Sequence, residues 1–294
     1  MIWTSMRDVD EDVEAGIPMA VRSGAQVLLT PDGVRLSARH DAPAPTASAG
    51  LGFVLAHGFT LDSGREHVRA LVRVLQETGG VISFDFRGHG ASTGLSTVGD
   101  LETLDLAAAV GWARALGYSR VVTAGWSMGA SVAIRQAALA GGVDAVVSVS
   151  GPSRWHFRGT APMRLLHRAV ETRLGRAVLA VGFGTRVASS GWLPPPEPPD
   201  AVAGRIAPAP LLIVHGDADR YFPIEHARWL ARAAGPTATL WEEPGFGHAE
   251  TAAAPELVAR IAAWADAATR PGERLGEGGT SARMSAETSA RMPT

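Results

Sequence analysis

The stretch VVTAGWSMGASVA, residues 121–133, decides the fold. It begins with an apolar, β-branched run typical of a short buried strand, and it ends in an alanine-rich segment typical of a helix. Between the two stands Gly125-Trp126-Ser127-Met128-Gly129. A Cβ at either glycine would collide with neighbouring backbone in so sharp a turn, which leaves the Ser127 hydroxyl at its apex. The stretch therefore predicts a strand, a tight turn and a helix, with Ser127 as a candidate nucleophile.

Apolar runs and amphipathic segments alternate on both sides of this turn. Residues 26–30 and 34–40 read as a hairpin through Pro31-Asp32-Gly33. The remaining predicted strands are residues 51–56, 81–84, 121–124, 145–149, 211–214 and 238–241, and the predicted helices are residues 64–78, 101–116, 127–140, 224–234 and 255–268. Fully apolar strands separated by amphipathic helices predict an α/β fold, with a mostly parallel sheet of about eight strands covered on both faces.

The alternation stops after Gly151. Residues 162–183 read as one helix with an apolar stripe, and WLPPPEPP at residues 192–199 follows it. The stripe consists of Met163, Leu166, Val170, Leu174 and Val178. We expect residues 153–203 to form a helical cap, or lid, inserted between two parts of the core, residues 25–152 and 204–269. Residues 1–24 would be an N-terminal extension and residues 270–294, rich in Gly, Ser, Thr and Arg, a disordered tail.

Composition excludes several classes of function. The 294 residues include no cysteine and no lysine, which removes thiolate and Schiff-base chemistry. The net charge is −2 and the charges are dispersed, so nucleic acid is not an expected partner. No basic, apolar leader and no apolar run of about 20 residues is present, which predicts a soluble, cytoplasmic protein without membrane insertion. Weak contact with a membrane surface stays open because of the cap arginines Arg164, Arg168, Arg173 and Arg176.

A serine, a carboxylate and a histidine each follow a different predicted strand. Ser127 follows the strand at 121–124, Asp217 and Asp219 follow that at 211–214, and His248 follows that at 238–241. Ligands of open α/β sheets bind at the carboxyl ends of the strands. We therefore expect a serine, an acid and a histidine to meet at one edge of the sheet.

Five motifs stand in order along the chain: HGF at 57–59, DFRGHG at 85–90, GWSMG at 125–129, HGDAD at 215–219 and GFGH at 245–248. With them the sequence resembles the α/β-hydrolase family over about residues 26–269, and within it the monoacylglycerol lipase and lysophospholipase-like branch. The resemblance implies that Ser127 is the nucleophile, His248 the general base and acid, and Asp219 the orienting carboxylate. It also implies an oxyanion hole of the backbone N–H groups of Phe59 and Met128, and acyl transfer to water through an acyl-serine.

Each of these residues has another interpretation. Ser127 suits a helix N-cap, and Asp217 lies on the same loop as Asp219. Some members of the family carry the acid one strand earlier, but residues 150–153 hold no carboxylate. His89 is the nearest competitor of His248; we interpret it, with Arg87 and Asp85, as bracing a turn.

Metal and cofactor sites are not predicted. His57, His215 and His248 would share the sheet edge, yet no HxH or HxxxH spacing occurs, so we expect no metal. Neither GxGxxG after the first strand nor GxxxxGK is present, and we expect no cofactor.

The substrate is expected to be a small ester with an apolar acyl group. Candidate residues of its pocket are Trp126, Trp155, Phe157, Phe183 and Trp192, although the cap stripe is equally consistent with packing on the sheet edge. An amide-cleaving aminopeptidase is one alternative, for which Glu171 and Glu197 are the candidate ligands of a substrate amine. A non-hydrolytic binding protein on the same scaffold is the other. The oligomeric state is not predicted.

Overall fold

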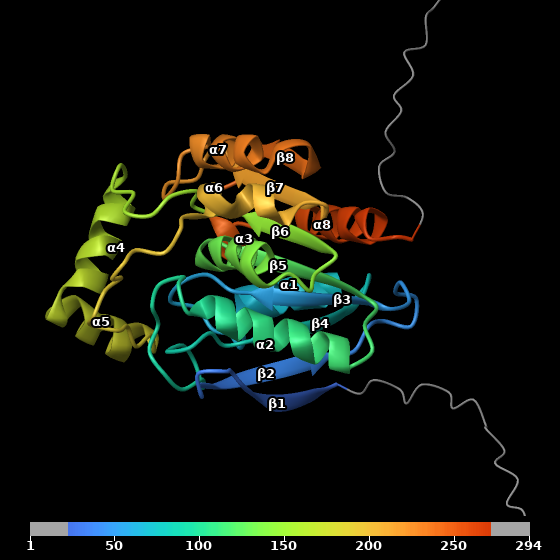
Figure 1. Ribbon diagram of the computed structural model, residues 1–294, viewed down its shortest axis with the longest axis horizontal. Helices are drawn as coiled ribbons and strands as arrows, with labels where there is room; N and C mark the ends of the chain where they lie inside the picture. Colours follow the sequence, from blue (N-terminus) through green and yellow to red (C-terminus); the bar gives the residue numbers. More distant parts are fainter. Residues whose placement is uncertain (1–22, 272–294) are drawn as a thin grey trace, which may run out of the picture.

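A single mixed sheet organises the chain in the computed structural model, which describes residues 23–271 (Figure 1). The sheet has eight strands in the order β1-β2-β4-β3-β5-β6-β7-β8. Their bounds are β1 Gly24–Leu29, β2 Arg35–Asp41, β3 Leu51–Ala56, β4 Gly80–Phe84, β5 Arg120–Trp126, β6 Ala145–Val149, β7 Leu211–Gly216 and β8 Ala238–Glu243. The mostly parallel α/β sheet is confirmed. The predictions for residues 1–22 and 272–294 lie outside the described residues.

The first two strands form the predicted hairpin. β1 pairs antiparallel with β2, and β2 pairs antiparallel with β4, while each remaining neighbouring pair is parallel. At the turn, the Thr30 hydroxyl donates to Asp32, and Gly33 adopts a φ of +83°, which a residue without a side chain accepts without strain. Every residue of β3, β4, β6 and β7 is buried, as expected for strands covered on both faces.

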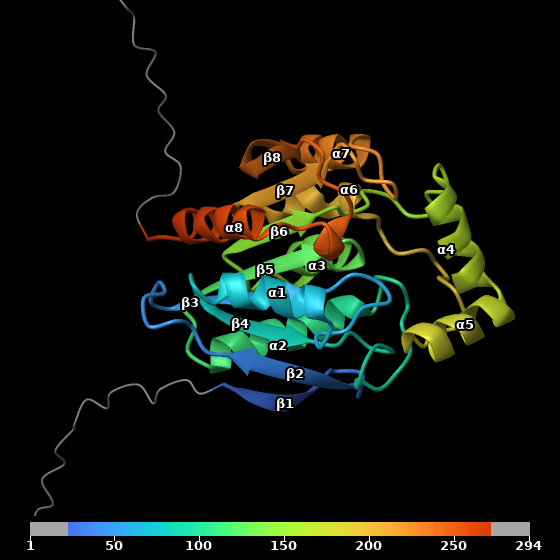
Figure 2. The same cartoon turned by 180° about the vertical axis from the view of Figure 1, so that it is seen from behind.

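Helices cover the two faces of the sheet (Figures 1 and 2). α2 Glu102–Ala115, α3 Met128–Ala140 and α7 Glu225–Ala234 pack on one face, and α1 Glu66–Leu75 and α8 Pro255–Ala268 pack on the other. Because successive strand residues point to opposite faces, Val54 joins the apolar core beneath α2 and α3, and Phe53 joins the core beneath α1 and α8. None of the helices within residues 23–271 is long and apolar enough to cross a bilayer.

The insertion forms two helices, so the prediction of one helix over residues 162–183 is wrong. α4 Ala161–Glu171 and α5 Arg173–Phe183 are separated at Thr172, whose backbone is extended and whose hydroxyl accepts from Gly175 N. Gly175 lies against α4, since a Cβ there would fall 2.4 Å from the Cα of Ala169. The apolar periodicity continues across Thr172, and it therefore hides the threonine cap that ends one helix and begins the next.

The predicted apolar stripe also divides at this break. Met163 on α4 is buried, but Leu174 and Val178 on α5 are 77% and 52% exposed. Both helices lie beyond one end of the sheet, on the left in Figure 1. The last residues of the predicted insertion belong elsewhere: α6 Pro199–Val202 and the 3₁₀ turn Ala203–Ile206 pack against α3 and α7.

Candidate active site

Ser127 stands on a strained turn between β5 and α3. Its φ of +52° and ψ of −115° are rare for a residue with a side chain. A Cβ on Gly125 would lie 2.2 Å from the carbonyl oxygen of Gly129, and a Cβ on Gly129 would lie 2.1 Å from that of Ala56. Both glycines are therefore required by direct backbone contact, and the contact with Ala56 presses the turn against the end of β3.

Ser127, His248 and Asp219 form one chain of hydrogen bonds. The Ser127 Oγ lies 2.9 Å from His248 Nε2, and His248 Nδ1 lies 2.8 Å from Asp219 Oδ2. Since an ionised carboxylate only accepts, Nδ1 carries the ring proton and Nε2 is left to accept from the serine hydroxyl. This arrangement allows His248 to take a proton from Ser127 and allows Asp219 to stabilise the resulting imidazolium.

Asp219, not its neighbour Asp217, contacts the histidine. The Asp219 Oδ1 accepts from the backbone N–H groups of Tyr221 and Phe222, at 2.7 and 3.1 Å, which fixes the carboxylate in a fully buried position. Asp217 instead accepts from Gly245 N at 2.6 Å and holds the turn that leads to His248. The Tyr221 ring stacks on the His248 ring with centroids 4.4 Å apart, which restrains the imidazole further.

The two predicted oxyanion donors border the Ser127 cavity. Among residues 23–271, neither the Phe59 N–H nor the Met128 N–H is hydrogen-bonded to another group. His57 fixes the peptide before Phe59: its Nε2 accepts from Phe86 N at 3.1 Å, so its Nδ1 must donate to the Gly58 carbonyl, 2.8 Å away. Burial lowers the pKa of His57 to about 4, so the ring is neutral and keeps this single proton.

Two further histidines near the site, His89 and His215, bind backbone carbonyl groups. His89 Nδ1 bonds the carbonyl of Arg87, and His215 Nε2 bonds that of Phe222, 2.9 Å away. Burial lowers the pKa of both rings, which keeps them uncharged. Within the part of the chain that the structure describes, no three His, Cys, Asp or Glu side chains are placed to share a metal ion.

An apolar cavity of about 200 Å³ opens beside Ser127 and beneath α4. Trp155, Phe157 and Trp192 line it, together with Met163, Leu166 and Val170 of α4. The indoles are fixed: Trp155 Nε1 donates to the Pro196 carbonyl and Trp192 Nε1 to the Thr97 carbonyl, at 2.8 and 2.6 Å. The cavity wall is therefore a rigid aromatic surface.

Two residues predicted for this pocket lie elsewhere. Trp126 is fully buried in the core beneath α1 and α8, because the alternation along β5 turns its side chain onto that face of the sheet. Phe183 ends α5 and is 48% exposed, away from the cavity lining. Both assignments were wrong for the same reason: aromatic type and nearness in sequence do not specify the direction of a side chain.

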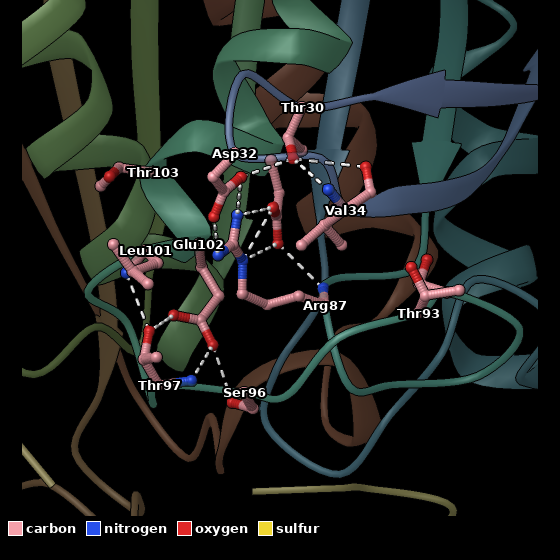
Figure 3. A network of polar contacts seen from close by, with 12 residues as sticks. Thr30, Asp32, Val34, Arg87, Thr93, Ser96, Thr97, Leu101, Glu102 and Thr103 are labelled. Carbon is pink, nitrogen blue, oxygen red and sulfur yellow. Dashed lines mark hydrogen bonds and ion pairs between the residues drawn. The ribbon is translucent and has the colours of Figure 1, made fainter. Parts of the chain in front are cut away.

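A polar network that the sequence did not reveal holds another part of the cavity wall (Figure 3). Glu102 accepts from the hydroxyls of Ser96 and Thr97 and from the backbone N–H groups of Thr97 and Gly99. Beside it, the buried Arg87 binds Asp105 and Asp32, with N–O distances of 2.7 Å to each. These contacts confirm that Arg87 braces its turn, and they fix the segment from Ser96 to Val98 that faces the cavity.

Glu250 is a second residue that the sequence analysis missed. It lies two residues after His248, is 5% exposed, and borders a second hollow of about 210 Å³ that also contains His248, Tyr221 and Thr60. Its Oε1 accepts from Gly58 N at 2.5 Å. A carboxyl so close to the GFGH motif was the only signal available, and its target across the sheet edge could not be inferred from it.

Comparison with known proteins shows the family to which this fold belongs. The model of the alpha/beta hydrolase family matches residues 53–261. A search of curated proteins gives no match. The esterase Pf2001 of Pyrococcus furiosus is similar in structure, with a TM-score of 0.64, 25% identity, and coverage of 83% of this chain and 92% of that one.

A lidless α/β serine hydrolase of Xanthomonas campestris shares the fold, with a TM-score of 0.57 and 22% identity over 86% of this chain and 96% of its own. A bacterial membrane phospholipase A shares it as well, with a TM-score of 0.61 and 18% identity over 85% of this chain and 87% of its own.

The glycines of the turn generate a paired prediction. Gly129→Ala places a Cβ against the Ala56 carbonyl and should lower the free energy of unfolding by about 1–3 kcal/mol or more. Gly111→Ala, on the exposed side of α2 with nothing within 4 Å, should instead raise it by about 0.5–1 kcal/mol through helix propensity. Urea unfolding of the two variants measures both effects, and equal stability of the two would contradict the close contact.

Proposed function

Because the chain belongs to the alpha/beta hydrolase family, as the match over residues 53–261 establishes, we propose that it cleaves carboxylic esters of apolar acyl groups through an acyl-serine intermediate. Membership of this family, and the structural similarity to the esterase of Pyrococcus furiosus, support the assignment of the protein as a hydrolase. The observation that carries the finer proposal is the chain of hydrogen bonds from Ser127 through His248 to Asp219, which opens onto an apolar cavity.

The proposed reaction has two halves. His248 Nε2 takes the proton of Ser127 as Oγ attacks the acyl carbonyl, and the Phe59 and Met128 N–H groups receive the negative charge on the carbonyl oxygen. The C–O bond to the alcohol then breaks, and His248 returns the proton to the leaving oxygen. Water, activated by the same histidine, attacks the acyl-serine and regenerates the hydroxyl.

The two hollows suggest where each half of the ester lies. His248 borders the hollow that contains Glu250 and Tyr221, but it does not border the apolar cavity. Since His248 must reach the leaving oxygen, we assign the alcohol to its hollow and the acyl group to the apolar cavity. Met163 and Leu166 border both spaces, whereas Val170 borders the apolar cavity alone.

Amide cleavage at a free amino terminus is less well supported. Of the two candidate ligands of a substrate amine, Glu171 contacts Arg158 and lies 3.2 Å from His167, and Glu197 is paired with Arg205 outside the cavity lining. Glu171 lines the cavity, but both carboxylates are already paired with an arginine, so we favour an ester over the aminopeptidase alternative.

Removal of the nucleophile tests the mechanism. Ser127→Ala should lower kcat for p-nitrophenyl butyrate by about 10⁴-fold or more, since the covalent step is lost. Asp219→Asn should also lower kcat strongly, whereas Asp217→Asn should retain most activity.

Labelling with a fluorophosphonate probe separates the proposal from the binding-protein alternative. Wild-type protein should be labelled at Ser127. Unchanged turnover in Ser127→Ala would refute the mechanism, and an absence of both labelling and turnover in the wild type would favour a non-hydrolytic binding protein.

The length of the acyl chain tests the cavity assignment. Val170→Phe fills space in the apolar cavity and should lower kcat/KM for p-nitrophenyl decanoate relative to the acetate by roughly tenfold, because one or two methylene groups lose their place. Val181→Phe, on the 91% exposed side of α5, is the matched control and should leave this ratio unchanged. An equal effect of both variants would contradict the assignment.

We also propose that the outer face of the cap makes weak contact with an anionic lipid surface. Leu174, Val178 and Val181 form an exposed apolar face on α5, with Val181 91% exposed. Residues 153–198 contain seven arginines and only two glutamates, while the whole chain has a net charge of −2. A basic segment with an exposed apolar face is attracted to negatively charged lipid.

Vesicle sedimentation tests this contact. Vesicles with phosphatidylglycerol should bind roughly ten times more protein than vesicles of phosphatidylcholine alone. Leu174→Ser with Val181→Ser should abolish the difference, and Leu139→Ser, a half-exposed leucine on α3, should not. If the double variant and the control variant bind the anionic vesicles equally, the contact is refuted. It is also refuted if the double variant changes only the oligomeric state, which would indicate a second copy of the chain as the partner.

A further inference from the structure

We infer that Glu250 is a positioning residue of the oxyanion hole, acting by holding the backbone of Gly58 so that the next N–H group, that of Phe59, faces the reacting carbonyl. The inference rests on the proposed acyl-transfer function and deepens it. It is drawn from the contact of a buried carboxyl with the loop after β3, across 192 positions of the sequence.

The contact is close and specific. Glu250 Oε1 accepts from Gly58 N at 2.5 Å, and a Cβ on Gly58 would lie 3.1 Å from Oε2 and 3.2 Å from Oε1. The carboxyl thus lies directly against the backbone of Gly58, where a side chain would force the carboxyl or the loop to move. Glu250 and Gly58 are far apart in the sequence, and their close contact depends on the absence of a side chain at Gly58.

Gly58 is held on both of its peptide groups. Glu250 accepts from its N–H, while the His57 ring donates to its carbonyl and Leu61 N lies 3.3 Å from the same oxygen. In a planar trans peptide, the N–H of the following residue points opposite to the carbonyl. Fixing the Gly58 carbonyl toward His57 therefore directs the Phe59 N–H away from that ring.

Glu250 is not a member of the catalytic chain itself. Glu250 accepts from the backbone N–H of Gly58 and from its own backbone N–H, while His248 already uses Nδ1 for Asp219 and Nε2 for Ser127. A carboxyl group two residues after the catalytic histidine therefore connects the loop of the base with the loop of the oxyanion donor. For acyl transfer, both loops must hold their functional groups at the correct distance from Ser127.

What the position requires is an acceptor of the right shape rather than a negative charge. Burial raises the pKa of Glu250 and so favours its uncharged form, although its backbone hydrogen bonds and the nearby His248 act in the opposite direction. A glutamine presents a carbonyl oxygen of the same reach. An isosteric amide should consequently support the loop, and a truncated side chain should not.

The experiment compares Glu250→Ala and Glu250→Gln with Glu256→Ala, a carboxylate removed from the exposed first turn of α8. With p-nitrophenyl butyrate, Glu250→Ala should lower kcat by about 10- to 100-fold, less than complete loss of one oxyanion donor, with KM changed less than about twofold. Glu250→Gln should recover kcat to within about threefold of wild type. Glu256→Ala should match the wild type.

A transition-state analogue separates positioning from mere loss of structure. An alkyl trifluoromethyl ketone forms an oxyanion adduct with the serine, so its Ki, measured on active sites titrated with a fluorophosphonate, should rise in Glu250→Ala by the same factor by which kcat falls. A destabilised but correctly assembled site would leave that Ki unchanged.

The outcomes separate this inference from the proposed function. If Ser127→Ala is inactive and Glu250→Ala has wild-type kcat and Ki, the positioning role is refuted while the mechanism stands. If Glu250→Gln is as impaired as Glu250→Ala, the role as a neutral acceptor is refuted. If Ser127→Ala keeps its activity, the proposed function itself fails.

Discussion

The backbone contact between the end of β3 and the turn after β5 is the constraint on which the rest of the site depends. A Cβ on Gly129 would lie 2.1 Å from the Ala56 carbonyl oxygen, so the turn can approach the neighbouring strand only without that side chain. β3 and β5 are neighbours in the sheet, with Ala56 opposite Gly125. The approach brings the loop that carries Phe59 beside Ser127, and Ser127 itself adopts a positive φ of +52° in the turn.

The other parts of the site follow from this placement. β7 and β8 lie farther along the same sheet, and the loops after them extend Asp219 and His248 back toward Ser127. Buried side chains then fix each loop: His57 and Glu250 hold Gly58, and Asp219 holds the backbone at Tyr221. The parallel strands thus bring these loops to one edge of the sheet, and local hydrogen bonds fix the positions that the proposed acyl transfer needs.

Much of this architecture could be predicted from the sequence. Apolar runs located the strands, since a strand covered on both faces is mostly apolar, and the predicted 51–56 and 145–149 agree with β3 and β6 residue for residue. Motifs at strand ends also pointed to Ser127, Asp219 and His248. Each of these motifs is local in sequence. The order of the strands in the sheet then brings the three side chains close together.

The features that were missed depend on direction or on contacts between distant segments. Trp126 was assigned to the pocket, yet its place on β5 turns it into the core. The cap was expected as one helix, because apolar periodicity passes over the cap formed by Thr172. Glu250 and Glu102 bind backbone groups, which no side-chain pattern reveals.

If the proposed mechanism is right, Ser127 becomes acylated during turnover. The most direct measurement is a rapid-quench experiment with p-nitrophenyl butyrate, followed by peptide mass spectrometry. We expect a burst of about one p-nitrophenol per protein and a butyryl group on the peptide that contains Ser127. Steady turnover with the acyl group on another residue would contradict it.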